Sequence, residues 1–471
     1  DFSVEDKIAI SKLLDEFGLA YIEGGYPGAN PTDSAFFTEK RTQNAGFVAF
    51  GMTKRAGVSV SNDPGLAALL QAKADAICFV AKSWDYHVHV ALGCTLEENI
   101  GTIRDSVEAA RGAEKEAMVD CEHFFDGYKA NRAYALACAR TAKEAGAEWV
   151  VLCDTNGGTL PHEVERIVAD VIKEVPGVRL GIHAHDDTGQ AVANSLAAVR
   201  AGVRQVQGTL NGLGERCGNA NLVTIIPTLK LKTEFADKFE IGVSDEALAG
   251  ITALSRAFDE LLNRVPNRQT PYVGVSAFAT KAGIHASALI KDPKTYEHIQ
   301  PETVGNRRLV LVSTQAGKSN VLAELERLGV SVEKNDPRLA RLAHLYLFTR
   351  PEVPAVYYGD EVGLRASDGW TIRSYRSKVS PHSFYVALCK GDLHQAADGQ
   401  DSVLLRAQRA QILGDVFGLA DDDSASRMRA SIRQIERAGR GVFLYVLGQH
   451  WPPEPLLEVP AGVHAPSLKP A

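Results

Sequence analysis

The sequence lacks several features that mark particular classes of protein. No apolar run approaches the roughly 20 residues needed to cross a bilayer, and the first residues, DFSVEDK, are polar rather than those of a secretory leader. The net charge of −7 gives no sign of a nucleic-acid partner. The seven cysteines include no Cys-x-x-Cys pair, which argues against a disulfide framework or a thiolate zinc site. We therefore expect a cytoplasmic protein with reduced thiols that binds neither membranes nor nucleic acids.

The sequence also lacks the glycine-rich turn of dinucleotide-binding folds, which disfavours a doubly wound open sheet. It has instead short apolar runs without polar alternation, typical of parallel strands buried on both faces, with stretches of helical spacing between them. These runs cover residues 19–25, 47–51, 76–81, 117–125, 148–155, 178–185 and 204–210. Seven such units predict an α/β fold, a (β/α)₈ barrel that is missing one strand.

Barrel enzymes carry their chemistry at the carboxyl ends of the strands, and here these ends are rich in oxygen and imidazole donors. His183 and His185 are two residues apart on a predicted strand, so both side chains point to the same face. Two neutral imidazoles can bind a divalent ion if oxygen donors complete the shell, and Asn219 could supply one. His87 and His89 have the same spacing but no Gly-Asn loop follows them, so we interpret them as structural.

Six longer segments carry a more specific signal. They are YIEGGYPGANPTDSAFF, KSWDYHVHVALGCTLEENIGTIRDSV, EHFFDGYKANRAYAL, LCDTNGGTLP, HAHDDTGQAVANSLAAVRAGVRQVQGTLNGLGERCGNANL and AFATKAGIHASALIKDPKTYEHIQPETVGNRR. Together they resemble the isopropylmalate and homocitrate synthase family of metal-dependent barrels over about residues 1–335. The EGGYPGANP segment favours the citramalate synthase branch of that family over the isopropylmalate branch.

The resemblance implies a Claisen-type condensation. Acetyl-CoA would lose a methyl proton and attack the ketone of pyruvate, which a divalent metal would polarise. Water would then release CoA and leave citramalate, a precursor of isoleucine. The metal would be Mg²⁺ or Mn²⁺, with Zn²⁺ as a further candidate. The alternatives are another 2-oxoacid acceptor, giving isopropylmalate or homocitrate, and a catalytically inactive fragment or fusion scaffold.

The resemblance also implies roles for individual residues. The metal ligands would be His183, His185 and Asn219. Thr155 and Glu23 would bind substrate, Thr155 through the pyruvate carboxylate. The residues implied in catalysis are Glu215 near the acetyl group, His285 and Tyr296 from the segment after the barrel, and Asp126, to which Glu122 is an open alternative.

Two positions depart from the family pattern. Members begin with a strand that ends in Asp-x-x-x-Arg-Asp-Gly, which supplies a carboxylate ligand and an arginine for the keto acid. This sequence starts at Asp1-Phe2-Ser3, directly after that point, so we expect a truncated barrel that binds metal weakly. Thr280 stands where a histidine is expected, which puts the support of His285 in doubt.

The last third of the sequence has a different character. Residues 341–364 resemble a short stretch of α-amylase-type glycoside hydrolases. Residues 368–450 resemble part of GTP cyclohydrolase II, but the three zinc cysteines of that family are replaced by Gln411, Asp422 and Ser424. We interpret this region as a degenerate α+β module, because three lost thiolates remove the zinc site and with it the cyclohydrolase activity.

The expected organisation therefore has five parts. The barrel would cover residues 1–265 and a helical linker subdomain residues 266–340. A hydrolase-like insert (341–367), the degenerate module (368–450) and a Pro-rich tail (451–471) would follow. Members of the family pair as dimers, so we expect a homodimer. In the family an amino-acid-sensing domain follows the linker, and because the sequence differs there, we expect no feedback inhibition by isoleucine.

Overall fold

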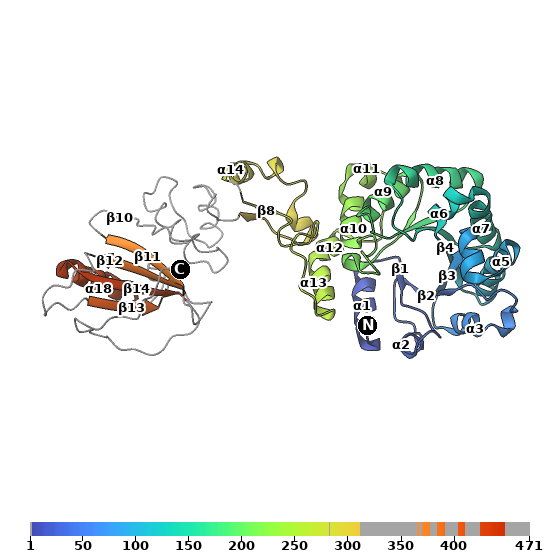
Figure 1. The fold of residues 1–471 in the computed structure, drawn as a ribbon, viewed down its shortest axis with the longest axis horizontal. Coiled ribbons are helices and arrows are strands. Elements are labelled where there is room, and N and C mark those ends of the chain that lie inside the picture. The colour runs from blue at the N-terminus through green and yellow to red at the C-terminus, as the bar shows by residue number, and fades with distance from the viewer. Residues whose placement is uncertain are drawn as a thin grey trace. The chain divides into compact units, whose positions relative to one another are not determined.

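A computed structural model of the 471-residue chain describes residues 2–281, 283–310, 365–366, 370–376, 384–390, 404–409 and 424–447 (Figure 1). These residues belong to two compact units, one made of residues 1–280 and 291–309, the other of residues 281–290 and 310–471. The hydrolase-like stretch at 341–364, the tail after residue 450 and the positions of Gln411 and Asp422 lie outside the described residues. Among the described residues, no helix combines the length and the apolar character needed to span a bilayer.

The first unit is built on a seven-stranded sheet whose neighbouring strands are all parallel. In chain order, which is also their order in the sheet, the strands are β1 (Tyr21–Glu23), β2 (Gly46–Met52), β3 (Ala76–Lys82), β4 (Glu116–Glu122), β5 (Trp149–Asp154), β6 (Leu180–Ala184) and β7 (Gln205–Gln207). No strand within the described residues joins β7 to β1. The prediction of a parallel barrel with seven of its eight strands is confirmed.

The sheet is strongly curled, as is shown by side chains of non-neighbouring strands that meet across its concave face. The Tyr21 hydroxyl of β1 donates to the Glu116 carboxylate of β4 at 2.7 Å. The indole nitrogen of Trp149, at the start of β5, donates to the same hydroxyl at 3.3 Å. We call this concave face the inner face of the sheet and the opposite face its outer face.

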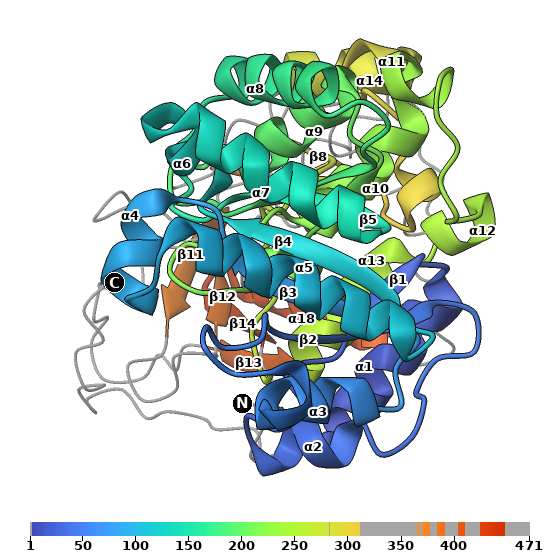
Figure 2. The ribbon, with the colours of Figure 1, turned by 90° about the vertical axis from the view of Figure 1, so that its right-hand side faces the viewer.

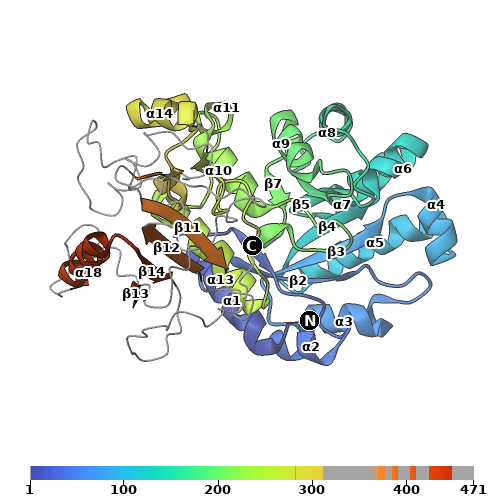
Figure 3. The same ribbon diagram turned by 60° about the vertical axis from the view of Figure 1, so that its left-hand side comes forward.

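Helices follow the strands and cover the outer face, as Figures 2 and 3 show. The helices described in the first unit are α1 (Val4–Phe17), α2 (Pro31–Phe36), α3 (Pro64–Gln71), α4 (Asp85–His87), α5 (Leu96–Gly112), α6 (Phe124–Ala130), α7 (Arg132–Ala145), α8 (Pro161–Glu174), α9 (Ala191–Ala201), α10 (Leu222–Leu231), α11 (Thr233–Ala236), α12 (Asp245–Leu248) and α13 (Ile251–Leu261). Capping residues in the sequence determine where several of these helices begin or end. Ser3 and Thr95 form capping boxes with Asp6 and Glu98, and Gly146 ends α7 with a φ of 97°.

The main core fills the space between these helices and the outer face of the sheet. It includes fully buried residues from successive strands, such as Ile77, Phe79, Val119 and Leu152, together with residues of α3, α5, α7 and α8. Full burial of each such side chain is worth about 1.5–3 kcal/mol. A smaller cluster of buried residues, which includes Cys78 and Trp149, lies on the inner face.

After the sheet, α13 packs against α1 in a second apolar cluster that contains Phe17, Leu254 and Phe258, and Leu248 of α12 belongs to the same cluster. The chain then forms β8 (Ala279–Thr280), which pairs with β9 (Leu309–Val310). The 3₁₀ segments η4 (Pro293–Thr295) and η5 (Pro301–Val304) lie between these two strands in the sequence.

The second unit contains α14 (Gly283–Lys291) and a five-stranded sheet in the order β10-β11-β12-β14-β13. Its elements are β10 (Arg365–Ala366), β11 (Trp370–Arg376), β12 (Phe384–Lys390), β13 (Leu404–Arg409), α18 (Ser424–Ala438) and β14 (Gly441–Leu447). Strand β13 is parallel to β14, whereas β10, β11, β12 and β14 pair antiparallel. Ile435 of α18 and Phe443 of β14 are buried, so this module has an apolar core of its own.

Candidate metal and substrate site

The two predicted histidine ligands stand together at the carboxyl end of β6. His183 is on the strand and His185 follows it directly, and their ring centroids are 5.2 Å apart. The backbone N–H of His185 donates to the Asp154 carbonyl at the end of β5, at 3.3 Å. Both imidazoles are therefore fixed at the carboxyl end of the sheet, where barrel chemistry occurs.

A loop after β7 brings Asn219 to the same place. His185 and Asn219 form an isolated antiparallel bridge, and the Ala220 N–H donates to the Ala184 carbonyl at 3.0 Å. The loop turns through Gly218, whose φ is 95° and whose surroundings leave no room for a Cβ, because it would collide with the Gly212 carbonyl oxygen. Only glycine suits both conditions, so the Gly-Asn pair of the sequence has a structural reason.

Two buried polar atoms of this group have no hydrogen-bond partner and fit a cation. His185 Nδ1 and Asn219 Oδ1 are both buried and have no hydrogen-bond partner. The Asn219 amide nitrogen donates to the Leu213 carbonyl at 3.1 Å, so its oxygen is the atom left open. Burial, the neighbouring His183 and Arg216 lower the pKa of His185 to about 4, which keeps its imidazole neutral. Buried acceptors without donors are costly, and a divalent ion would satisfy them.

The donor set is short of carboxylates. Among the residues that the structure describes, no group of three or more His, Cys, Asp or Glu side chains is arranged to hold a metal ion. His183, His185 and Asn219 would thus offer two imidazoles and one amide oxygen. Further ligands would come from substrate oxygens or water.

Arg216 ties this loop to its neighbours. Its guanidinium donates twice to the Asp187 carboxylate, at 2.8 and 2.9 Å, and once to the Thr155 carbonyl, at 2.8 Å. Paired, planar contacts of this kind fix orientation as well as distance. The loops that follow β5, β6 and β7 are therefore held in one arrangement.

Thr155 follows β5 in a loop held by the fully buried Asp154, which accepts from the Thr159 hydroxyl at 2.8 Å. The Thr155 hydroxyl oxygen accepts from the His123 N–H at 2.8 Å. The hydroxyl hydrogen of Thr155 is therefore free to donate to a substrate carboxylate.

Glu122 and Asp126 occupy different surroundings. Glu122 is at the end of β4 and forms an ion pair with Lys82, at the end of β3. Asp126, on α6, lies 3.6 Å from His123 Nδ1 and accepts from Asn156 at 2.8 Å, contacts that hold the pKa of this carboxylate below its usual range. Glu122 is thus on the sheet itself, and Asp126 is on the helix that follows it.

Glu23, at the end of β1, faces the same hollow. Burial among the inner-face residues and the nearby Asp120 carboxylate raise the pKa of Glu23 to about 8. The side chain is nevertheless accessible to solvent, and water moderates this rise.

The other three predicted catalytic residues are exposed. Glu215 is 85% exposed and its nearest charged partner is Arg216, at 3.8 Å. Tyr296, just after η4, is 48% exposed. His285 is on α14 in the second unit, where its side chain is exposed. Their catalytic roles stay predictions.

The structure also draws attention to residues that sequence reasoning set aside. The rings of His87 and His123 are 4.1 Å apart, and the buried Nδ1 atom of each lacks a hydrogen-bond partner. Trp84 stacks on His87 with centroids 5.3 Å apart. His89, by contrast, is exposed. The spacing of the two histidines gave no reason to separate His87 from His89.

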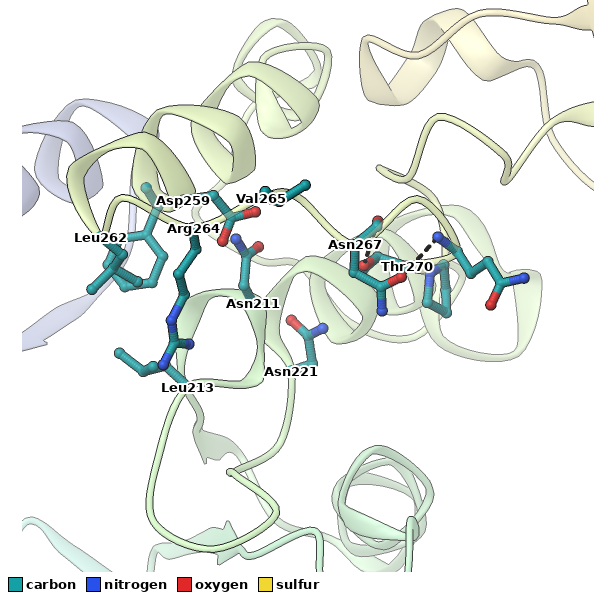
Figure 4. A pocket seen from close by; sticks show the side chains of 12 residues that line it. Asn211, Leu213, Asn221, Asp259, Leu262, Arg264, Val265, Asn267 and Thr270 are labelled. Atoms are coloured by element: carbon teal, nitrogen blue, oxygen red, sulfur yellow. Dashed lines mark hydrogen bonds between the residues drawn. The ribbon is translucent and has the colours of Figure 1, made fainter. Parts of the chain in front are cut away.

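A separate pocket of about 300 Å³ lies between the loop after β7 and the segment after α13 (Figure 4). Asn211 and Asn221 face its centre, and Arg264 extends toward Leu213. None of the predicted metal, substrate or catalytic residues lines it.

Comparisons with known proteins agree with this geometry. The HMGL-like family model matches residues 1–248, the homocitrate synthase post-HMGL domain-like model residues 272–341, and the GTP cyclohydrolase II model residues 361–458. The resemblances noted in the sequence to the synthase family and to GTP cyclohydrolase II are thereby confirmed.

Individual relatives are close in sequence but longer than the matched region. The chain is 49% identical to an (R)-citramalate synthase of Aquifex aeolicus over 72% of this chain and 64% of that protein. It is 50% identical to an (R)-citramalate synthase of Geobacter sulfurreducens over 71% of this chain and 63% of that protein. The chain thus spans less than two thirds of the length of these relatives. A homocitrate synthase of Methanopyrus kandleri is 35% identical over 71% of this chain and 80% of its own length. With a family model over more than half of its residues and relatives at these identities, the chain belongs to the HMGL-like family.

Proposed function

We propose that this protein is an acyltransferase that condenses acetyl-CoA and pyruvate, with water, to (R)-citramalate and CoA. The observation that carries the proposal is the open donor set of His183, His185 and Asn219 beside Thr155, in a chain about half identical to curated (R)-citramalate synthases. Citramalate would serve the synthesis of isoleucine. A cytoplasmic homodimer is part of the same proposal.

The metal site would consist of His183, His185 and Asn219. When bound there, a divalent cation such as Mg²⁺ or Mn²⁺ supplies a Lewis acid that polarises the ketone of the 2-oxoacid. Zn²⁺ is a further candidate.

The residues around these ligands would bind the 2-oxoacid. The Thr155 hydroxyl has its hydrogen available for the pyruvate carboxylate, because its oxygen already accepts from His123. Arg216 holds the Thr155 backbone, so the hydroxyl keeps its place relative to the β6 histidines. A carboxylate held in this way would present the ketone carbon for attack.

Proton transfer from the acetyl methyl group would use an inner-face carboxylate. Between Glu122 and Asp126 we favour Glu122, because it is at the end of β4 and its ion pair with Lys82 of β3 fixes its position on the inner face. One Asp126 oxygen, Oδ2, already accepts from Asn156 and lies 3.6 Å from His123 Nδ1. Glu23, with its raised pKa, is placed to hold a proton at the same end of the hollow. Carbon–carbon bond formation and hydrolysis of the thioester complete the reaction.

A non-catalytic scaffold is the second candidate. Two observations on the described residues favour it: the sheet is not closed, and the donor set lacks a carboxylate. The choice of 2-oxoacid is a third question, because homocitrate synthases also match this chain.

The decisive experiment measures CoA release from acetyl-CoA by the purified protein with Mg²⁺ or Mn²⁺. We expect activity with pyruvate to exceed that with 2-oxoisovalerate or 2-oxoglutarate. His185→Ala should abolish it. The matched control is His89→Ala, which removes an exposed histidine of the other His-x-His pair.

Activity that survives His185→Ala would refute the proposed site. Absence of CoA release with every 2-oxoacid, in a protein that stays folded, would instead support the scaffold.

A further inference from the structure

Behind the proposed metal ligand His183 lies a group of polar side chains whose other members have no role in the function proposed above. It consists of Cys78 on β3, Asp120 on β4, Gln207 on β7 and His183 itself, and we call it the Gln207 network. Cys78 is fully buried and Asp120 is 5% exposed. Since β4 and β7 are not neighbours in the sheet, Asp120 and Gln207 meet across the concave inner face.

The hydrogen bonds of the network have a fixed direction. The Gln207 amide nitrogen donates to Asp120 Oδ1 at 2.9 Å, since an amide nitrogen can only donate. This bond turns the other end of the amide, Oε1, toward His183 Nδ1 at a distance of 2.8 Å. A carbonyl oxygen cannot donate, so Nδ1 carries the proton. Cys78 completes the network by donating to Asp120 Oδ1 at 3.1 Å.

We propose that Gln207 and Asp120 are positioning residues that hold His183 in the tautomer with its proton on Nδ1, so that Nε2 presents a bare lone pair to a divalent cation. The inference rests on the proposed function only for the identity of the bound group. Its structural part, the tautomer of His183, can be tested without any reaction.

The physical need for such a device is plain. A neutral imidazole exists as two tautomers, and the one with a proton on Nε2 cannot bind a metal through that atom. The ring must also be held against rotation. One hydrogen bond to Nδ1 meets both needs, provided that the acceptor cannot itself turn over. Asp120 prevents this at Gln207, because a turned amide would place its oxygen against a buried carboxylate.

Gln205 offers a matched control on the same strand. It is two residues before Gln207, so it points to the same face, and its amide contacts the Met118 sulfur at 3.5 Å. We expect Gln207→Leu to weaken Mn²⁺ binding, measured by titration calorimetry, by about 10–100-fold, the usual cost of losing the partner of a metal-binding histidine. Gln205→Leu should leave the dissociation constant within about threefold of its original value, since it touches no such partner.

The second readout is the tautomer itself, in the metal-free protein. Long-range ¹H–¹⁵N spectra of ¹⁵N-histidine-labelled protein show whether Nε2 carries a proton, because Hδ2 couples chiefly to that nitrogen. The His183 signal is assigned by its loss in His183→Gln. We expect a bare Nε2 in the unaltered protein and in Gln205→Leu, and a mixture of tautomers in Gln207→Leu and Asp120→Leu.

Three results would overturn the inference. The first is a protonated His183 Nε2 in the unaltered protein, which would overturn the inference even if no variant folds. Equal Mn²⁺ affinity in Gln207→Leu and Gln205→Leu would do so as well. An unchanged tautomer in Asp120→Leu would remove Asp120 from the proposal. If these tests succeed while the protein releases no CoA from acetyl-CoA and pyruvate, the network stands and the proposed reaction fails.

Discussion

Ile77 and Cys78 are neighbours on β3 and both are fully buried, yet their side chains lie on opposite faces of the sheet. On the outer face, Ile77 joins an apolar core with Val119 of β4 and Leu152 of β5. On the inner face, Cys78 donates a hydrogen bond to Asp120. The same strands therefore serve two purposes in alternate residues.

The difference lies in what burial costs. An apolar side chain gains free energy when it leaves water, whereas a buried carboxylate such as Asp120 must be hydrogen-bonded to be tolerated. Asp120 accepts from Cys78 and Gln207. The outer face thus supplies stability, and the inner face uses some of it to hold polar groups in fixed positions.

The largest effect expected from this comparison is on stability. Ile77→Ala should lower the free energy of unfolding by about 2–5 kcal/mol, because it leaves a cavity in the main core. Cys78→Ser, its inner-face neighbour, should change it by only about 1 kcal/mol, because the hydroxyl can still donate to Asp120. Urea unfolding of the two variants measures both values. Similar losses in the two variants would contradict the division between the faces.

The next largest effect is a loss of metal binding with little loss of stability. Asn219→Ala removes an oxygen that has no partner in the metal-free protein and one hydrogen bond to the Leu213 carbonyl. The free energy of unfolding should therefore fall by only about 1 kcal/mol. Mn²⁺ binding should weaken by at least about 100-fold, because a lost ligand costs more than a lost outer partner. Calorimetry that shows unchanged binding would exclude Asn219 from the site.

A smaller effect, on the KM for pyruvate, should distinguish two surface arginines. Arg216 and Arg200 are about equally exposed, at 43% and 45%, and each pairs with a carboxylate, Asp187 and Glu234 respectively. Lysine at either position should cost less than about 1 kcal/mol of stability. Only Arg216→Lys should raise the KM for pyruvate, by about tenfold, because it releases the Thr155 loop. Equal KM values in the two variants would contradict the role of Arg216.

The same comparison explains what could be read from the sequence. The strands were predictable, because outer and inner residues together make continuous apolar runs such as AICFVA. The pair His183 and His185 was predictable from the two-residue repeat of a strand. In both cases the signal is local, within one element.

Contacts between strands gave no such signal. Asp120 is one acid in the run AMVDCEHFF, and Gln207 is 87 residues further along the chain. Their contact depends on the curl of the sheet, which brings β4 opposite β7. His87 was interpreted as structural for a similar reason, since its closeness to His123 arises from the meeting of two loops.

The smallest effect is a change with pH at Glu23, on the inner face. Burial and the Asp120 carboxylate raise the pKa of Glu23 to about 8, from an ordinary value of 4.5. Between these pH values the folded protein holds a proton that the unfolded chain has lost. Folding stability from this group is therefore present below pH 4.5 and declines as the pH rises toward about 8. The effect is small because water reaches the carboxylate.

Glu23→Gln tests this sign, because glutamine cannot ionise. The variant should gain stability relative to the original protein as the pH rises across that window, in urea unfolding measured in the absence of metal. A constant difference between the two proteins would show that Glu23 ionises like an ordinary surface carboxylate. The inner face would then tolerate Glu23 through its access to water rather than by keeping it protonated.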